Sequence, residues 1–80
     1  MSVTVLLFAS YADALGAGSL VVDLPANATV ADVLAELRRR PGADRLPPSP
    51  LVAVNQHYAS PMSAVRAGDE VAVIPPVAGG

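Results

Sequence analysis

The chain has 80 residues, a formal net charge of −2, no cysteine, and apolar residues at 52% against charged residues at 15%. A chain this short forms one domain with a thin core, and without cysteine it has no disulfide framework, thiolate metal site or cysteine nucleophile. Its five basic residues, all arginine, are outnumbered by seven acidic ones, so we expect no binding of nucleic acid or of a membrane surface. We also expect no metal site around His57, because it is the single histidine of a chain without cysteine.

The N-terminal segment gives no sign of a targeting signal. It has no charged n-region, and its longest apolar stretch, residues 5–9, is far shorter than the ~18 residues of a membrane span. We therefore expect a cytoplasmic protein. Soluble domains average about 25% charged residues, so the low charged share here implies either many surface alanines or an apolar patch for a protein partner.

Residues 3–8 alternate as a strand with two apolar faces. One face carries Val3, Val5 and Leu7, and the other carries Thr4, Leu6 and Phe8. Such a strand is central in its sheet and covered on both sides, or it presents one face to another protein.

A short connection follows, with a helical turn expected at residues 11–15 and closed by Gly16 and Gly18. Residues 19–24 form the second strand, with Leu20, Val22 and Leu24 on one face. The two strands therefore predict a hairpin with a long loop.

The main helix begins at Thr29. Thr29 and Asp32 fit the capping-box pattern, with Asp in place of the usual Glu. Val30, Val33, Leu34 and Leu37 form a single apolar stripe. Three arginines, residues 38–40, lie in the last turn, where positive charge suits the negative end of the helix dipole, and we expect their side chains to be solvated. The pair 41–42 (Pro-Gly) ends the helix.

The second half of the chain is rich in proline and short strands. We expect residues 43–50 to form an irregular loop across the end of the sheet, followed by a third strand at 51–55. A turn at Gln56-His57 and a weak strand at 58–60 come next, with His57 as an exposed turn residue. A short helical turn within residues 61–67, a tight turn at Gly68-Asp69 and a last strand at 70–74 complete the pattern.

This order predicts an α+β fold of the β-grasp, ubiquitin-like architecture: a mixed four- to five-stranded sheet with one main helix packed across one face. The first and last strands are apolar on both faces, so we expect them to be the central pair, and their pairing would be parallel. Residues 1–80 form a single domain, with 75–80 as an extended C-terminal tail.

The tail carries the candidate chemistry. Pro75 and Pro76 end the last strand and direct the remaining residues off the sheet. Six extended residues reach on the order of 20 Å, enough to enter another protein's active site. Gly79 and Gly80 have no Cβ, so they fit a channel that any side chain would block, and they present an unhindered carboxylate. The competing interpretation is a tail whose two glycines are incidental.

Four motifs together resemble the small subunit of molybdopterin synthase, the MoaD-like sulfur carriers of the ubiquitin-like MoaD/ThiS family. They are Phe8-Ala9, the run 53–56 (Ala-Val-Asn-Gln), the run 68–71 (Gly-Asp-Glu-Val) and the closing run 75–80 (Pro-Pro-Val-Ala-Gly-Gly). The thiazole-synthesis sulfur carriers, a sister family, are similar in fold but usually lack the Pro-Pro pair. The chain departs from the family at residues 11–13, where a basic residue is often found, and at Ala78, where Thr or Ser is common.

The resemblance implies a chain that catalyses nothing alone and binds no cofactor. An adenylyltransferase and sulfurtransferase of the ubiquitin-activating type would use ATP to adenylate the Gly80 carboxyl, which a sulfur donor then converts to a thiocarboxylate, a 1-thioglycine. In the active site of the large subunit, this group would attack the cyclic pterin precursor. Two such deliveries build the dithiolene of molybdopterin.

The resemblance also implies a use for surplus apolar surface. Leu6, Phe8 and Ile74 would anchor the large subunit, since aromatic and aliphatic anchors dominate interface energy. The tail contacts would be Pro75, Pro76, Val77 and Ala78.

Three other functions remain open. The chain can be a carrier of the same fold that serves thiamin, tRNA or cysteine synthesis. It can be a protein modifier conjugated through Gly80, although it has no lysine through which to form chains of itself. It can also be a ubiquitin-like binding module with an incidental tail.

Overall fold

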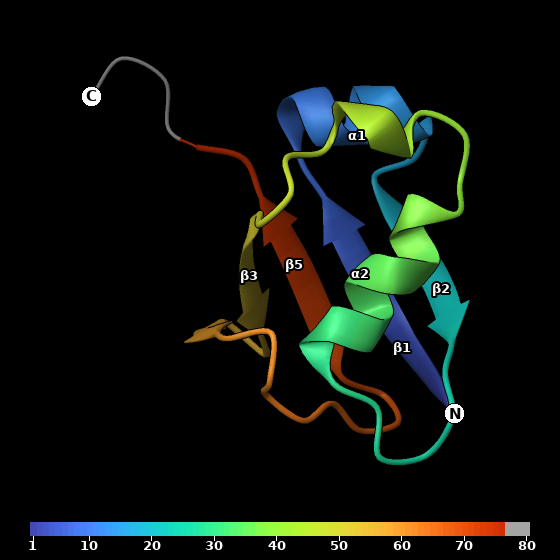
Figure 1. Cartoon of the computed structure of the whole chain (residues 1–80), viewed down its shortest axis with the longest axis vertical. Helices are drawn as coiled ribbons and strands as arrows, with labels where there is room; N and C mark the ends of the chain where they lie inside the picture. Colours follow the sequence, from blue (N-terminus) through green and yellow to red (C-terminus); the bar gives the residue numbers. More distant parts are fainter. Residues whose placement is uncertain (77–80) are drawn as a thin grey trace.

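Five strands form one mixed sheet in the order β2-β1-β5-β3-β4 in the computed structural model, which describes residues 1–76 (Figure 1). The elements are β1 (Ser2–Leu7), α1 (Ala9–Leu15), β2 (Ser19–Asp23), α2 (Val30–Arg38), the 3₁₀ helix η1 (Ala43–Arg45), β3 (Leu51–Val54), β4 (His57–Ala59) and β5 (Glu70–Ile74). The α+β, β-grasp prediction is confirmed.

The centre of the sheet is the parallel pair of β1 and β5, as predicted. Thr4 lies opposite Glu70 and Leu7 opposite Val73. The predicted hairpin is also present, since β1 pairs antiparallel with β2. On the other side, β3 pairs antiparallel with β5, and the three-residue β4 forms the outer edge.

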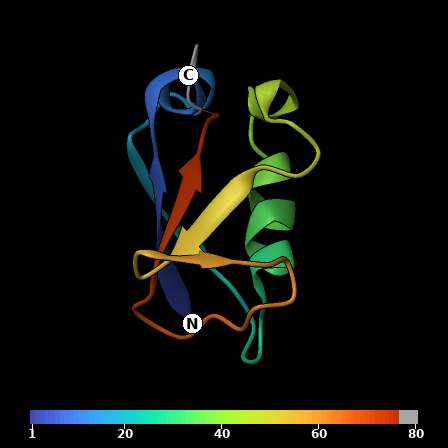
Figure 2. The same cartoon turned by 90° about the vertical axis from the view of Figure 1, so that its left-hand side faces the viewer.

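The core lies between the sheet and α2. Figure 2 shows α2 across one face of the sheet, with no helix of the described chain on the other face. The most deeply buried side chains are Val3, Val5, Val30, Val33, Leu37, Val71 and Val73. Leu34, the fourth member of the predicted helical stripe, is half-buried and packs at the margin of this core.

The predicted capping box fixes the start of α2. The backbone amide of Thr29 donates to Asp32 Oδ2 at 2.8 Å, and the Thr29 hydroxyl donates to the same oxygen at 3.2 Å. The expected helical turn within residues 61–67 is wrong. This segment instead runs beside the start of α2, where the Val30 amide donates to the Ser63 carbonyl at 2.9 Å and Thr29 forms an isolated bridge with Ala64.

The irregular loop expected at residues 43–50 contains η1, so this prediction is wrong in part. Gly42 has a left-handed backbone, with φ of 88°, and a Cβ added there would lie 1.9 Å from the Ala14 carbonyl oxygen. Only glycine therefore allows this close approach to α1. The reversal at Gly42 brings Ala43 into the core, where it is buried.

All three arginines are exposed, as predicted, but Arg38 also forms hydrogen bonds that the sequence did not predict. Its Nη1 donates to the Leu46 carbonyl at 3.0 Å, and its Nη2 donates to the Pro47 carbonyl. The side chain therefore ties the end of α2 to the proline-rich segment. Arg39 forms an exposed ion pair with Glu36 at 3.2 Å.

The turn between β3 and β4 lies one residue earlier than predicted. Val54 pairs with His57, so the turn residues are Asn55 and Gln56, with φ of 49° and 71°. Two consecutive positive φ values match the right-handed twist of a two-residue hairpin, and Asn adopts this conformation more readily than most residues. His57 is exposed and belongs to β4.

A hydrogen-bonded clamp joins this turn to the start of β5. Asn55 Nδ2 donates to Asp69 Oδ1 at 3.1 Å, and the Glu70 amide donates to Asn55 Oδ1 at 3.0 Å. The Arg66 amide donates to Asp69 Oδ2 at 2.8 Å. The Asn55 amide group, followed by the Arg66 backbone amide, lowers the pKa of Asp69. Two of the sequence motifs, 53–56 and 68–71, therefore meet in one structural contact.

Replacing Asp69 by alanine is expected to lower the free energy of unfolding near neutral pH. Because the folded-state pKa is lowered, this stabilisation is present in full above the unfolded pKa of about 3.9 and is lost as the pH falls through the folded value. Urea unfolding at several pH values measures the difference between wild type and Asp69→Ala. This difference should shrink on acidification, and a constant difference would contradict the role of the ionised carboxylate. Asp13→Ala is the control, since it removes a carboxylate that is exposed.

Candidate functional site

The face of the sheet opposite α2 is apolar and exposed. We call it the open face. It consists of Leu6, Phe8, Val21, Leu51, Tyr58, Ala72 and Ile74. Four of the five large hydrophobic side chains that are exposed in the described chain lie here: Phe8 is 45% exposed, Val21 65%, Leu51 47% and Tyr58 76%.

The structure brings the three predicted anchors to one side. Leu6 lies opposite Ala72 in the β1–β5 ladder, and Ile74 lies two residues further along β5, so both point to the same face. Phe8 follows Leu6 by two residues and keeps an extended backbone, with φ of −128° and ψ of 152°. Leu6 and Ile74 are half-buried, while Phe8 is exposed.

Sequence reasoning missed Val21, Leu51 and Tyr58. Val21 lies opposite Thr4, Leu51 opposite Ile74, and Tyr58 opposite Ala53. The signal for Val21 was present, because the alternation that places Leu20 and Val22 on one face places Val21 on the other. Leu51 and Tyr58 could not be assigned, because their faces depend on the β3–β5 and β3–β4 registers.

The ionisable strand residues on this side are acidic. Glu70 lies opposite Thr4, and Asp23 lies opposite Ser2. Within the described strands, no arginine lies on this face. A partner that covers the open face would therefore bring an apolar surface with a basic margin.

The open face leads directly to the predicted tail. Beyond Ile74, Pro75 is half-buried and Pro76 is exposed. A hollow of about 290 Å³ lies at this point, lined in part by Tyr11, Ile74 and Pro76. The other predicted tail residues, Val77, Ala78, Gly79 and Gly80, lie outside the described residues.

Within residues 1–76, no group of three His, Asp or Glu side chains is placed to hold a metal ion. No helix in this part of the chain combines the length and apolar character needed to cross a membrane. The arrangement favours docking of another protein beside the root of the tail.

These features define a class: a ubiquitin-like β-grasp domain with one helix-covered face and one open apolar face. The particular family follows from comparison of sequences. The chain belongs to the ThiS family, whose sequence profile matches residues 5–80, and this confirms the MoaD/ThiS resemblance.

Two relatives carry the name molybdopterin synthase sulfur carrier subunit. The protein from Chlamydomonas reinhardtii is 35% identical over 83 residues, which cover 100% of each chain. The protein from Arabidopsis thaliana is 31% identical over 81 residues, which cover 100% of this chain and 84% of the relative. Among solved structures, small archaeal modifier protein 1 (SAMP1) from Haloferax volcanii is similar with a TM-score of 0.86 and 35% identity, over 100% of both chains.

Proposed function

We propose that this chain is the sulfur carrier subunit of a molybdopterin synthase and that it carries sulfur as a thiocarboxylate on Gly80. The likeness over the full chain to two proteins of that name, at 31–35% identity, carries the proposal. The open face beside the tail root supports it, because a carrier must hold its partner while its tail reaches the partner's active site.

The Gly80 carboxylate is activated, loaded with sulfur and restored in three steps. An adenylyltransferase of the ubiquitin-activating type joins the Gly80 carboxylate to AMP, with loss of pyrophosphate from ATP. A donor of sulfide-level sulfur then attacks the acyl carbon through sulfur, AMP leaves, and the thiocarboxylate remains. In the large subunit, the thiocarboxylate sulfur forms a C–S bond in place of a C–O bond of the pterin precursor, and the oxygen leaves in water or phosphate. Hydrolysis of the resulting thioester leaves sulfur on the pterin and restores the Gly80 carboxylate.

This chain supplies docking and delivery in the proposed reaction. The open face binds the large subunit through Phe8, Leu6 and Ile74, and Pro75 and Pro76 start the tail along its path. General acids, general bases and pterin contacts come from the large subunit. ATP is bound by the activating enzyme and not by this chain.

The intact mass of the protein, with and without its sulfuration machinery, tests the proposal. We expect a gain of about 16 Da, because sulfur replaces oxygen, and loss of this gain when Gly80 is deleted. An unchanged mass under both conditions would contradict the sulfur-carrier function.

Replacing Phe8 by aspartate is expected to abolish or severely weaken binding of the large subunit. Loss of one aromatic anchor costs about 2 kcal/mol or more at an interface, which corresponds to roughly thirtyfold in Kd. The fold should persist, because Phe8 is the N-cap of α1 and makes no side-chain capping bond there, while Asp is a favoured N-cap residue.

Met62→Asp is the matched control for this variant. Met62 is 81% exposed and lies in the turn after β4, outside the sheet. Isothermal titration with the large subunit should show normal affinity for Met62→Asp. A folded Phe8→Asp protein that binds as tightly as this control would disprove the docking role of the open face.

Deleting Gly80, or adding one residue after it, is expected to stop sulfur transfer and to change docking little. The deletion moves the reacting carboxyl by about 3.3 Å, the length of one extended residue. Transfer to the pterin precursor and affinity for the large subunit are measured on the same preparation. Transfer at the wild-type rate in either variant would exclude the tail mechanism.

The likeness to small archaeal modifier protein 1 favours one second candidate, a modifier joined to target proteins through Gly80. The mass measurement separates the two. Covalent attachment to another protein, lost on deletion of Gly80, would support the modifier, whereas the thiocarboxylate mass supports the carrier.

A further inference from the structure

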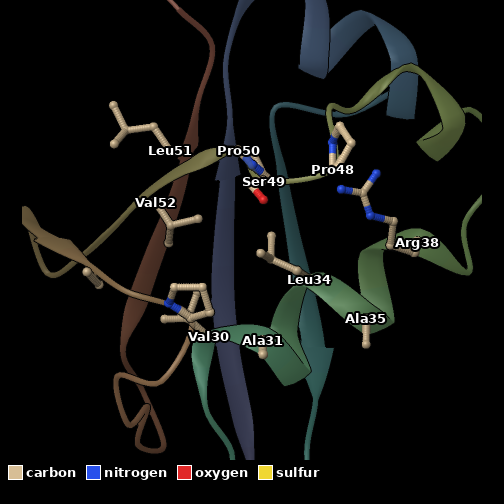
Figure 3. A pocket seen from close by; sticks show the side chains of 12 residues that line it. Val30, Ala31, Leu34, Ala35, Arg38, Pro48, Ser49, Pro50, Leu51 and Val52 are labelled. Carbon is tan, nitrogen blue, oxygen red and sulfur yellow. The ribbon is translucent and has the colours of Figure 1, made fainter.

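A second apolar surface lies on the opposite side of the sheet from the open face. It is a hollow of about 550 Å³ between α2 and the segment that leads into β3, and we call it the helix–proline groove. One wall includes Ala31, Leu34 and Ala35 of α2, and the other includes Pro48, Pro50 and Val52. Figure 3 shows the Leu34 side chain projecting into the space between these walls.

Small side chains on α2 create the room in this groove. Ala31 and Ala35 lie one turn apart on the groove-lining side of the helix, and both are exposed. A methyl group at each position leaves space where a longer side chain would fill the hollow.

Arg38 closes one end of the groove and is held in place before any ligand arrives. Arg38 lines the hollow, and two of its guanidinium N–H groups donate to the carbonyls of Leu46 and Pro47. A guanidinium has five N–H donors, so three remain for a carboxylate. Because the side chain is already ordered, binding costs little rotamer entropy.

The stretch of sequence around Arg38 is positively charged in an otherwise acidic chain. Residues 36–45 contain four of the five arginines and two of the seven acidic residues, a net charge of +2, so the rest of the chain carries −4. The groove therefore combines apolar walls with a basic end, whereas the strand residues around the open face are acidic.

From this complementarity we propose that the helix–proline groove binds an extended segment of another protein, made of about four apolar residues with acidic residues at one end, the end that lies at Arg38. The span of α2 from Val30 to Arg38 is about 12 Å at 1.5 Å per residue. Four extended residues cover about 13 Å. The acidic residues then meet the guanidinium of Arg38.

Binding in this groove is compatible with use of the open face. The two surfaces lie on opposite sides of the sheet, and of the open-face residues only Leu51 reaches the margin of the groove within the described chain. The chain can therefore hold an acidic segment of one protein while a second protein covers its open face. This inference does not depend on the proposed sulfur chemistry.

Titration of the full-length ¹⁵N-labelled protein with synthetic peptides tests the proposal. The probe is an acetylated and amidated peptide of sequence Val-Ile-Val-Leu-Asp-Asp, with the reversed sequence as a second probe because the groove does not fix chain direction. We expect one of them to shift the amide signals of Ala31, Leu34 and Arg38. The same peptide with Asn-Asn at its end should bind about tenfold more weakly or worse, since a charged hydrogen bond is lost.

Two variants of the protein probe the two parts of the groove. Arg38→Gln removes the charge and should weaken binding about tenfold or more, while Arg66→Gln removes an equal charge elsewhere and should leave it unchanged. Ala35→Leu fills the hollow with a good helix-forming residue and should abolish binding. This second variant keeps the test valid if Arg38→Gln disturbs the segment at residues 46–47.

Several results would overturn the proposal. They are no binding of either peptide, signal changes confined to the open face, and equal affinities of wild type, Arg38→Gln and Ala35→Leu. Analytical ultracentrifugation measures self-association of the chain and gives one more result that would overturn the proposal. Self-association that requires both Arg38 and Gly80 would mean that the groove takes the apolar C-terminal segment of a second copy and not an acidic partner.

Discussion

The parallel pairing of β1 with β5 is the constraint on which the rest of the structure depends. Because the two strands run in the same direction, both finish at the same edge of the sheet. Phe8 follows the end of β1, and Pro75 follows the end of β5. The exposed aromatic side chain and the root of the tail are therefore neighbours, although 66 positions separate them along the chain. An antiparallel pairing would have placed them at opposite edges.

Two apolar surfaces explain why the chain has a low percentage of charged residues. On one side of the sheet, Val21, Leu51 and Tyr58 extend the apolar area that Leu6 and Phe8 begin. On the other side, α2 does not close fully against the segment that leads into β3, and apolar side chains line the opening. Acidic residues accompany the first surface and arginines the second. A small domain with few charges can thus present two chemically different faces to partners.

Local patterns were enough to predict most of the elements. The Thr29–Asp32 capping box, the stripe on α2 and the two doubly apolar strands involve residues close together in sequence. What the sequence did not predict involves contacts outside its local patterns. η1 follows Gly42, which lies close to the Ala14 carbonyl, and Arg38 donates to carbonyl groups eight and nine residues away. The shared face of Phe8 and Ile74 was predictable from the sequence, whereas the faces of Leu51 and Tyr58 depend on strand registers that no local pattern contains.

The place of β5 in the sheet has a consequence for how the protein is made. Of the strands in residues 1–76, β5 leaves the ribosome last, yet it lies between β1 and β3 and makes the ladder contacts that join the β1–β2 hairpin to the β3–β4 hairpin. Until residues 70–74 have emerged, the nascent chain holds two unconnected hairpins and a helix without a complete sheet to cover. Folding of this domain is therefore completed after nearly all of its sequence has been translated, in contrast to proteins whose N-terminal half folds first.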